Sequence, residues 1–473
     1  MGRRFFPHKK GTIAQRLSGG QKISRTCYAV EGTGHMLLHT LYDQLMKTKT
    51  TIYPEHYCLS LLLDTEGCHG AVLWDIVHGK IITARAKATL LATGGCGKIF
   101  ATTSNARTST GDGLALAYHA GIPLEDMEMI QFHPTGMYGK GFIVSEASRG
   151  EGAFLLNANG ERFMKKYAPQ KMELAPFDVA ARGIAMEILQ GKGAGSKKDH
   201  VFIDMRPLGK EKITERVPEI HQTVREQLGI DCTKDLIPIT PTAHYSMGGI
   251  PTDTQTRVTM NEHASPVKGL YAAGEVACLS VHGANRLGGN SLLETQVFGR
   301  IAGIEMSEYA RQKKTQTKID ETRFIEQAMK RIEMLLQNSK GSKSNAIQEK
   351  LQETMMKDCG IFRNKEGLQR GIRIRSQLAK DAATIHVEDK GMEFNTDLIN
   401  AIETQNMVTF SQAILESALA RRESRGSHYR TDYPTRNDEG WMKHILCVQK
   451  GEKPMISYKK VVIAGYAPEK RHY

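Results

Sequence analysis

Four glycine-containing segments of this sequence combine the residue types that bind a dinucleotide. Residues 92–95 (ATGG) end an apolar strand, 111–113 (GDG) open a helix, and 269–275 (GLYAAGE) predict a strand, a tight turn and an acidic residue. Residues 282–293 (HGANRLGGNSLL) run into a further helix. Glycine turns are common at strand–helix junctions, so each segment alone also fits an ordinary turn. Together they offer close backbone approach, helix N-terminal amides and a carboxylate for a ribose hydroxyl.

Three further segments place histidines, an arginine and carboxylates beside glycines. They are residues 131–136 (QFHPTG), 145–152 (SEASRGEG) and 244–251 (HYSMGGIP). An isolated histidine is more often a hydrogen-bonded core residue than a ligand, although it can also act as an acid, a base or a donor. A nearby arginine and glutamate are more often a surface ion pair. On residue types alone, both interpretations remain open.

In this order the seven segments closely resemble the flavoprotein subunit of succinate dehydrogenase and fumarate reductase. The likeness continues through residues 422–428 (RESRGSH), Asp432 and Trp441. L-Aspartate oxidase shares the core motifs, but the chain past Trp441 is more similar to the succinate/fumarate group. For the histidines of QFHPTG and HYSMGG, the matching neighbours favour a functional role.

The resemblance implies hydride transfer between a dicarboxylate, succinate or fumarate, and FAD, with a proton moving on the opposite side. A dicarboxylate needs fixed cations and hydrogen-bond donors at both ends, and the planar fork of an arginine suits a carboxylate. The implied substrate-binding residues are His133, Ser145, His244 and Arg286. Glu146 and Arg149 match the proton-relay pair of the family and are the implied catalytic residues.

The cofactor implied by the resemblance is FAD. Glu275 would bind a ribose, and Asp112 and Ser291 would lie near the flavin or its pyrophosphate. The full set of implied cofactor-binding residues is Gly94, Gly95, Asp112, Glu275, Ser291 and Leu292.

The chain departs from the family pattern first near its start. None of its 45 glycines forms the G-x-G-x-x-G loop that seats a pyrophosphate. Residues 32–35 (GTGH) already match a later part of the family pattern. We therefore expect that the first βαβ unit, roughly 30 residues or more, is missing and that the sequence is N-terminally truncated.

The second departure lies at a chemically decisive position. The family carries an arginine directly before an aspartate at the start of a capping-domain helix, and this arginine exchanges a proton with substrate. Here the sequence reads Pro176-Phe177-Asp178-Val179, so a phenyl ring takes that place. Loss of a general acid typically slows a reaction about 100- to 10,000-fold. Arg182, one helical turn beyond Asp178, is a poor substitute.

The elements that position these residues predict an α/β protein: a Rossmann-like FAD-binding domain without its first βαβ unit, an inserted α+β capping domain and a C-terminal helical domain. Residues 51–64, 71–77 and 81–92 read as a meander ending in an apolar strand. Beyond about residue 320, apolar residues recur at three- and four-residue spacing, as in amphipathic helices. The expected domains are 1–129 and 246–310 (FAD-binding), 130–245 (capping), 320–425 (helical) and 426–473 (an irregular tail).

The composition is that of a globular protein, with 40% hydrophobic and 24% charged residues among 473. No run of 18 apolar residues predicts a membrane span, and the start lacks the apolar region of a secretory signal. The eight cysteines include no C-x-x-C pair, so we expect no metal site. The net charge of +13 reads as solvated surface, because its basic clusters lack the interleaved aromatics of single-strand nucleic-acid sites.

The resemblance also implies partners and a location. We expect an iron–sulfur subunit to accept the electrons, and membrane-anchor subunits to hold the complex indirectly at the cytoplasmic face of the inner membrane, assuming a bacterial or archaeal source. Nucleic acid is not an expected partner. Two alternatives remain open: an inactive truncated paralogue, and an enzyme similar to L-aspartate oxidase.

Overall fold

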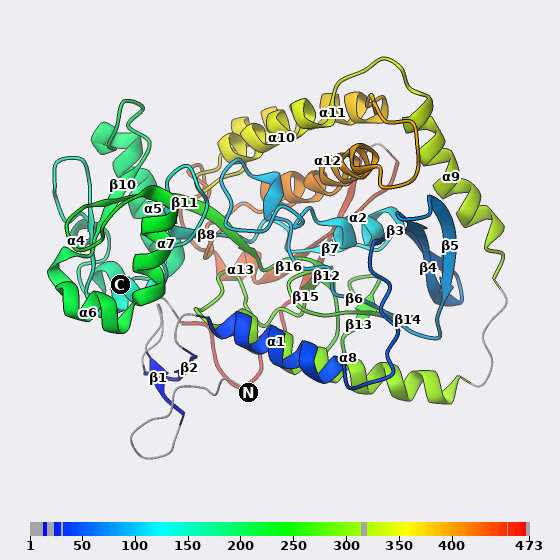
Figure 1. The fold of residues 1–473 in the computed structure, drawn as a ribbon, viewed down its shortest axis with the longest axis horizontal. Helices are drawn as coiled ribbons and strands as arrows, with labels where there is room; N and C mark the ends of the chain where they lie inside the picture. Colours follow the sequence, from blue (N-terminus) through cyan, green and yellow to red (C-terminus); the bar gives the residue numbers. More distant parts are fainter. Residues whose placement is uncertain (1–12, 17–22, 30–31, 314–318, 452, 470–473) are drawn as a thin grey trace.

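The computed structural model describes residues 13–16, 23–29, 32–313, 319–451 and 453–469. Figure 1 shows an elongated molecule with one unit, built from the α4–α7 region and its sheet, at one end and long helices along one side. Within these described ranges, no helix is both long and apolar enough to cross a membrane. Residues 1–12, part of the predicted FAD-binding domain, lie outside the described residues.

The sheet that carries the first glycine turns has the strand order β13-β14-β6. β6 and β14 are parallel, with Leu270 opposite Thr89 and Ala272 opposite Leu91, so both strands end at the same edge. The turns that follow them, at Gly94 and Gly274, therefore lie close together. The strands are β6 (Thr89–Leu91), β13 (Arg257–Thr259) and β14 (Pro266–Ala272), and α8 (Asn290–Gln312) packs against β14.

The predicted meander is confirmed as an antiparallel three-stranded sheet of order β3-β4-β5. Its centre is buried, with Leu62, Val72 and Trp74 fully inaccessible. The predicted strand over 81–92 is two strands, since β5 ends at Arg85 and β6 begins at Thr89 in another sheet. The elements of this region are α1 (Thr33–Leu45), β3 (His56–Asp64), β4 (Gly67–Asp75), β5 (Lys80–Arg85) and α2 (Asp112–His119).

The unit that follows is organised around a four-stranded antiparallel sheet of order β8-β11-β10-β9. A separate hydrophobic cluster, running from Met137 to Ile239, fills it. β8 is buried along its whole length because α5 covers it on one side. The elements are β8 (Ile130–Met137), α3 (Glu146–Glu151), β9 (Phe154–Leu156), α4 (Met164–Tyr167), α5 (Phe177–Glu187), β10 (Val201–Asp204), α6 (Lys210–Arg216), α7 (Pro218–Leu228) and β11 (Ile237–Ser246).

Four long helices follow, as the three- and four-residue spacing predicted. α12 is the central one, buried along most of its 25 residues and in contact with α2, α9, α10 and α11. Sequence reasoning did not delimit α11, although its buried Leu368, Gly371, Leu378 and Ala382 keep helical spacing. The helices are α9 (Thr322–Gln337), α10 (Ser344–Asp358), α11 (Lys365–Ala383) and α12 (Thr396–Ala420).

The prediction of an irregular C-terminal tail is wrong. α13 (Asp438–Trp441) leads into an antiparallel hairpin of β16 (Lys443–Val448) and β17 (Met455–Lys460), and β16 also pairs with β7 (Leu124–Glu125). The short apolar run Ile445–Cys447 is buried against α12 and β7. This three-residue apolar run is too short to predict a strand by itself, and its contact with β7 joins residues more than 300 positions apart.

Candidate active site

Two neighbouring antiparallel strands bring the predicted histidines together. His133 lies on β8 and His244 on β11, where the pairing of the two strands shifts register between Ala243 and Tyr245. Their ring centroids are 5.2 Å apart, and His133 is 3% exposed. His133 Nδ1 accepts a hydrogen bond from the Thr135 amide (3.2 Å), which leaves the proton of a neutral ring on Nε2.

Both imidazoles are neutral at physiological pH. Burial, followed by the nearby His244, Arg149 and Arg286, lowers the pKa of His133 well below its usual value. Burial and the charge of Arg286 lower the pKa of His244 to about 3. Each ring therefore offers a neutral N–H donor rather than a positive charge.

The permanent charge of the site belongs to Arg286, in the loop before α8. It is 5% exposed, and its guanidinium lies 4.8 Å from the centre of the Tyr245 ring. Nη1 donates to the Leu287 carbonyl and the Ser291 hydroxyl (3.3 Å each), whereas Nε has no partner among the described residues. A buried guanidinium with an unused donor favours an anionic ligand.

Phe177 is part of this site. It is the first residue of α5, it is 6% exposed, and its ring centroid lies 4.9 Å from that of His133, edge to face. The guanidinium carbon of Arg149 lies 5.7 Å from the same ring. The position at which the resemblance predicts a proton-exchanging arginine therefore faces the histidine, and an apolar ring occupies it.

Ser145, Glu146 and Arg149 begin α3 beside Phe177. Ser145 is the N-cap, and its hydroxyl accepts from the Ala147 amide at 3.3 Å. Arg149 is buried; Nη1 donates to the Glu173 carbonyl (2.6 Å), and Nη2 lies 3.9 Å from Glu146 Oε1. Nε and Nη2 of Arg149 have no hydrogen-bond partner in the described part of the chain. The ring of Phe177 thus contacts both Arg149 and His133.

Gly95 and Glu275, two of the predicted cofactor residues, meet where β6 and β14 end. A Cβ on Gly95 would lie 2.4 Å from Glu275 Oε1, so only glycine permits this approach, and Gly94 is in the left-handed conformation. Glu275 Oε1 accepts from the Ser246 amide (3.0 Å), two residues after His244. Burial raises the pKa of Glu275 to about 7.

The other three predicted cofactor residues are not all brought together. Ser291 lies in the first turn of α8 and accepts from Arg286, and Leu292 is its neighbour. Asp112 begins α2, but its carboxylate accepts from Asn406 of α12 (2.7 Å) and Thr110 (2.8 Å). Its side chain is thus engaged with the helical part of the chain.

Around these segments, several buried polar atoms lack a hydrogen-bond partner within the described ranges. They include Gln131 Oε1, His282 Nδ1 and Arg286 Nε, all from the motifs above. Buried polar atoms are almost always hydrogen-bonded, so such a group indicates a polar ligand or water. With the glycine approach at Gly95 and the helix N-terminus of α8, these residues fit FAD.

Sequence reasoning missed two supporting networks. In the first, Gln131 donates to Asn285 (2.8 Å), which donates to Asp178 (2.9 Å), so the loop of Arg286 is tied to the first turn of α5. In the second, Glu294 accepts from Tyr245 (2.6 Å) and lies 2.6 Å from His282 Nε2. The available signal was their adjacency to the motif residues, which does not reveal contacts across the fold.

Comparison with known proteins defines the class. Residues 1–292 match the FAD binding domain family model and residues 348–473 match the fumarate reductase flavoprotein C-terminal model. The succinate dehydrogenase flavoprotein subunit of Rickettsia bellii is 41% identical over 477 residues, covering 98% of this chain and 80% of that protein. The mitochondrial succinate dehydrogenase flavoprotein subunit of Oryza sativa is also 41% identical, over 97% of this chain and 74% of its own length.

Solved structures agree. An E. coli quinol fumarate reductase FrdA variant superposes with a TM-score of 0.93 at 33% identity, covering 99% of this chain and 82% of its own. Mycobacterium smegmatis Sdh1 gives a TM-score of 0.84 at 33% identity, over 98% and 78%. The chain belongs to the family of FAD-binding flavoprotein subunits of succinate dehydrogenase and fumarate reductase, which are oxidoreductases and parts of larger complexes. The predicted family, fold class and cofactor are confirmed.

Proposed function

We propose that this chain binds succinate and fumarate between Arg286 and the two neutral imidazoles, and that it exchanges hydride with them slowly. The observation that supports this proposal is the proximity of the three side chains: the rings of His133 and His244 lie 5.2 Å apart, and the charge of Arg286 reaches both. One carboxylate would accept from the guanidinium fork, and the N–H groups of the rings and the hydroxyl of Ser145 would hold the rest of the substrate.

When bound, FAD supplies the hydride acceptor. Gly94, Gly95 and Glu275, with Ser291 and Leu292 at the start of α8, would hold it. Glu275 would accept a hydrogen bond from a ribose hydroxyl, in addition to the one that it accepts from the Ser246 amide. The role of Asp112 would be indirect, through α2, because its carboxylate already accepts two hydrogen bonds.

The proton step is where this chain differs from its relatives. Glu146 and Arg149 would carry protons inward from solvent, but the next position holds the ring of Phe177. A phenyl ring neither transfers a proton nor offsets a carboxylate. We therefore expect a turnover about 100- to 10,000-fold below that of an enzyme with an arginine there.

The same ring favours a second candidate: a flavoprotein subunit that binds dicarboxylate and assembles with partners but does not turn over. The two candidates share every binding contact and differ only in chemistry. An aspartate-oxidising enzyme similar to L-aspartate oxidase is the third, with oxygen as its acceptor.

For partners, we propose an iron–sulfur subunit that accepts electrons, and membrane-anchor subunits that hold the complex at the cytoplasmic face of the inner membrane. The names of the relatives support this proposal, since they are subunits of succinate dehydrogenases and of a quinol fumarate reductase. Co-purification of this chain with an iron–sulfur protein is the direct test.

The decisive experiment measures binding and turnover separately. Fumarate binding is followed by the change in flavin absorbance, and turnover by succinate-dependent dye reduction. Arg286→Gln should weaken fumarate binding about 10- to 100-fold. Arg300→Gln, an exposed arginine of α8, is the matched control and should bind normally.

Fumarate binding without any succinate-dependent reduction would support the non-catalytic candidate. Oxygen-dependent oxidation of L-aspartate would support the third. Fumarate binding that is equal in the Arg286→Gln and Arg300→Gln variants would reject the proposed site.

A further inference from the structure

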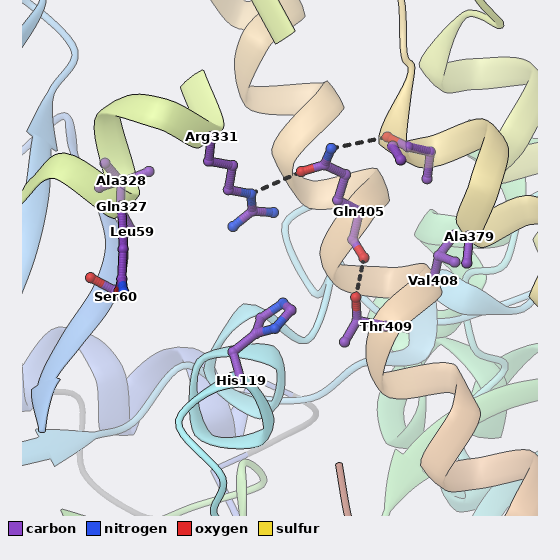
Figure 2. Close-up of a pocket in the computed structure, with 12 residues that line it drawn as sticks. Leu59, Ser60, His119, Gln327, Ala328, Arg331, Ala379, Gln405, Val408 and Thr409 are labelled. Carbon is purple, nitrogen blue, oxygen red and sulfur yellow. Dashed lines mark hydrogen bonds between the residues drawn. The ribbon is translucent and has the colours of Figure 1, made fainter. Parts of the chain in front are cut away.

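A cavity of about 340 Å³ lies away from the candidate active site, at the junction of the FAD-binding and helical parts of the chain. In Figure 2, β3 and α9 lie on one side of it, α11 and α12 lie on the other, and α2 lies below. None of its lining residues belongs to the substrate or cofactor segments described above. It is therefore a separate candidate site.

Arg331 of α9 provides the permanent charge of this cavity. Nε donates to Gln405 Oε1 (2.8 Å), and Nη2 donates to Asn406 Oδ1 (2.9 Å) and the Ile402 carbonyl (3.3 Å). All three acceptors are neutral and lie on α12. Among the described residues, Arg331 forms no ion pair within 4.0 Å and Nη1 has no hydrogen-bond acceptor. The guanidinium is thus fixed in place without a counter-ion.

His119, the last residue of α2, points into the same space from the opposite side (Figure 2). His119 is exposed to solvent, and partial desolvation together with the charge of Arg331 lowers the pKa of its imidazole below the usual value. The imidazole is therefore neutral at physiological pH and offers one N–H donor. Among the other polar lining residues, Gln405 and Thr409 already form hydrogen bonds within the fold. Gln327 is exposed, and the buried Ser60 hydroxyl has no hydrogen-bond partner among the described residues.

The other acidic groups near Arg331 are turned to other partners. Asp112 accepts from Asn406, and the Tyr57 hydroxyl also interacts with Asp112. Burial, followed by the charge of Asp112, raises the pKa of Glu403 to about 7, so it is partly protonated near neutrality. Asp112 acts on Arg331 only through space and through the shared Asn406, so no carboxylate contacts the guanidinium directly within the described part of the chain.

The walls between Arg331 and His119 are apolar. Leu59 of β3, Ala328 of α9, Ala379 of α11 and Val408 of α12 form them, and Ser60 of β3 adds one hydroxyl. The volume falls in the range of small-molecule pockets, and a pocket with one fixed cation suits one negative charge rather than two.

We propose that this cavity binds a small organic monoanion, whose carboxylate contacts Arg331 and His119 and whose short apolar body packs against Leu59, Ala328 and Val408. The planar fork of Arg331 matches a carboxylate. The apolar walls disfavour inorganic phosphate, which has no apolar body to bury. The bound molecule would connect α9 and α12 to β3 and α2, joining the two parts of the chain.

Hexanoate is the probe, added to the full chain and followed by titration calorimetry and by the His119 ring signals in NMR. We expect saturable binding that raises the pKa of His119, because a neighbouring carboxylate stabilises the imidazolium. Arg331→Gln should weaken binding about 10- to 100-fold. Arg323→Gln, on the exposed face of the same helix, is the matched control and should leave binding unchanged.

Two further arms keep the result specific. Ala379→Leu fills the cavity without changing charge and should also block hexanoate, with an unchanged circular dichroism spectrum as the folding check. Hexanol, which lacks the carboxylate, should bind at least tenfold more weakly. No saturable hexanoate binding, equal binding in the Arg331→Gln variant, or binding lost in Arg286→Gln instead, would overturn the proposal.

Discussion

At the scale of single residues, the site combines retained binding groups with one altered reactive group. Arg286 and His133 are buried and His244 is half-buried; desolvation, with the charge of Arg286 adding to it, lowers the pKa of both rings and keeps them neutral. Phe177 packs against His133 and Arg149 as an apolar residue would pack in a core. Under the proposed function, binding and chemistry are separable in this chain, because Phe177 cannot donate a proton while Arg286 would still bind a carboxylate.

Replacing Phe177 by arginine tests this separation. Phe177→Arg restores a cation beside Arg149 and His133, so succinate-dependent dye reduction should rise about 100-fold or more. Fumarate affinity should rise as well, because the substrate gains a second cation. Phe177→Leu, which keeps an apolar side chain, is the control and should remain as slow as the parent chain. Equal turnover in the two variants would assign the chain to the non-catalytic candidate.

Glu275 gives a pH prediction. Its folded pKa of about 7 lies above the value of 4.5 for an unperturbed glutamate, because burial disfavours the carboxylate. The stabilising contribution of the protonated form is complete below about pH 4.5 and is lost as the pH rises through 7. The free energy of unfolding of the flavin-free chain should therefore fall by up to about 3 kcal/mol between pH 4.5 and 8. In the Glu275→Gln variant, the free energy of unfolding measured with urea should lack this fall of about 3 kcal/mol.

At the scale of elements, the sequence predicted helices and turns that depend on neighbouring residues, and it missed contacts between residues far apart in the chain. The spacing in residues 109–121 predicts a helix with Asp112 at its start, and α2 begins there. The resemblance assigned Gly95 and Glu275 to one cofactor site, and the structure brings them together because the parallel strands β6 and β14 end at one edge. No periodicity indicated that Asp112 would bond Asn406, 294 residues later, or that residues 443–448 would pair with β7.

Gly111 shows how a turn and a helix–helix contact depend on one residue. It precedes α2 with φ of +77°, and a Cβ there would lie 2.6 Å from the Phe410 ring of α12. Gly121, after the same helix, has φ of +80° and open space around it. Gly111→Ala should lower the free energy of unfolding by about 1–3 kcal/mol more than Gly121→Ala, because only the first adds overpacking to backbone strain. Urea unfolding of both variants measures the difference, and equal losses would show that α12 yields to the methyl group.

At the scale of the whole molecule, buried charge joins the C-terminal segment to the first half of the chain. Arg421 donates to Glu128 (2.6 Å) and Glu423 (3.2 Å), and Lys459 of β17 pairs with Glu125. Removing one partner of a buried ion pair typically costs about 3–5 kcal/mol, so these contacts tie the hairpin to β7 in one arrangement. They also bring together acids and bases that no local sequence pattern connects.

His444 makes that attachment sensitive to pH. Its Nδ1 lies 2.6 Å from Asp126 Oδ2; burial alone would lower the pKa of His444, but the hydrogen bond and charge of Asp126 raise it above its usual 6.5. For Asp126 the directions are reversed. Burial alone would raise the pKa of Asp126, but the hydrogen bond and charge of His444 lower it below its usual value. The ion pair therefore stabilises the fold between the two pKa values and weakens as the pH rises through that of His444.

His444→Gln should thus destabilise the chain more at pH 5.5 than at pH 8.5, by about 1–2 kcal/mol, with faster proteolysis of the β16–β17 hairpin at the lower pH. His78→Gln is the control, because His78 pairs with Asp75 at an exposed position (66% side-chain exposure) and solvent screens that pair. The control should unfold like the parent chain at both pH values. A His444→Gln deficit that is the same at pH 5.5 and pH 8.5 would mean that His444 contributes packing alone, and that Lys459 and Arg421 hold the hairpin without it.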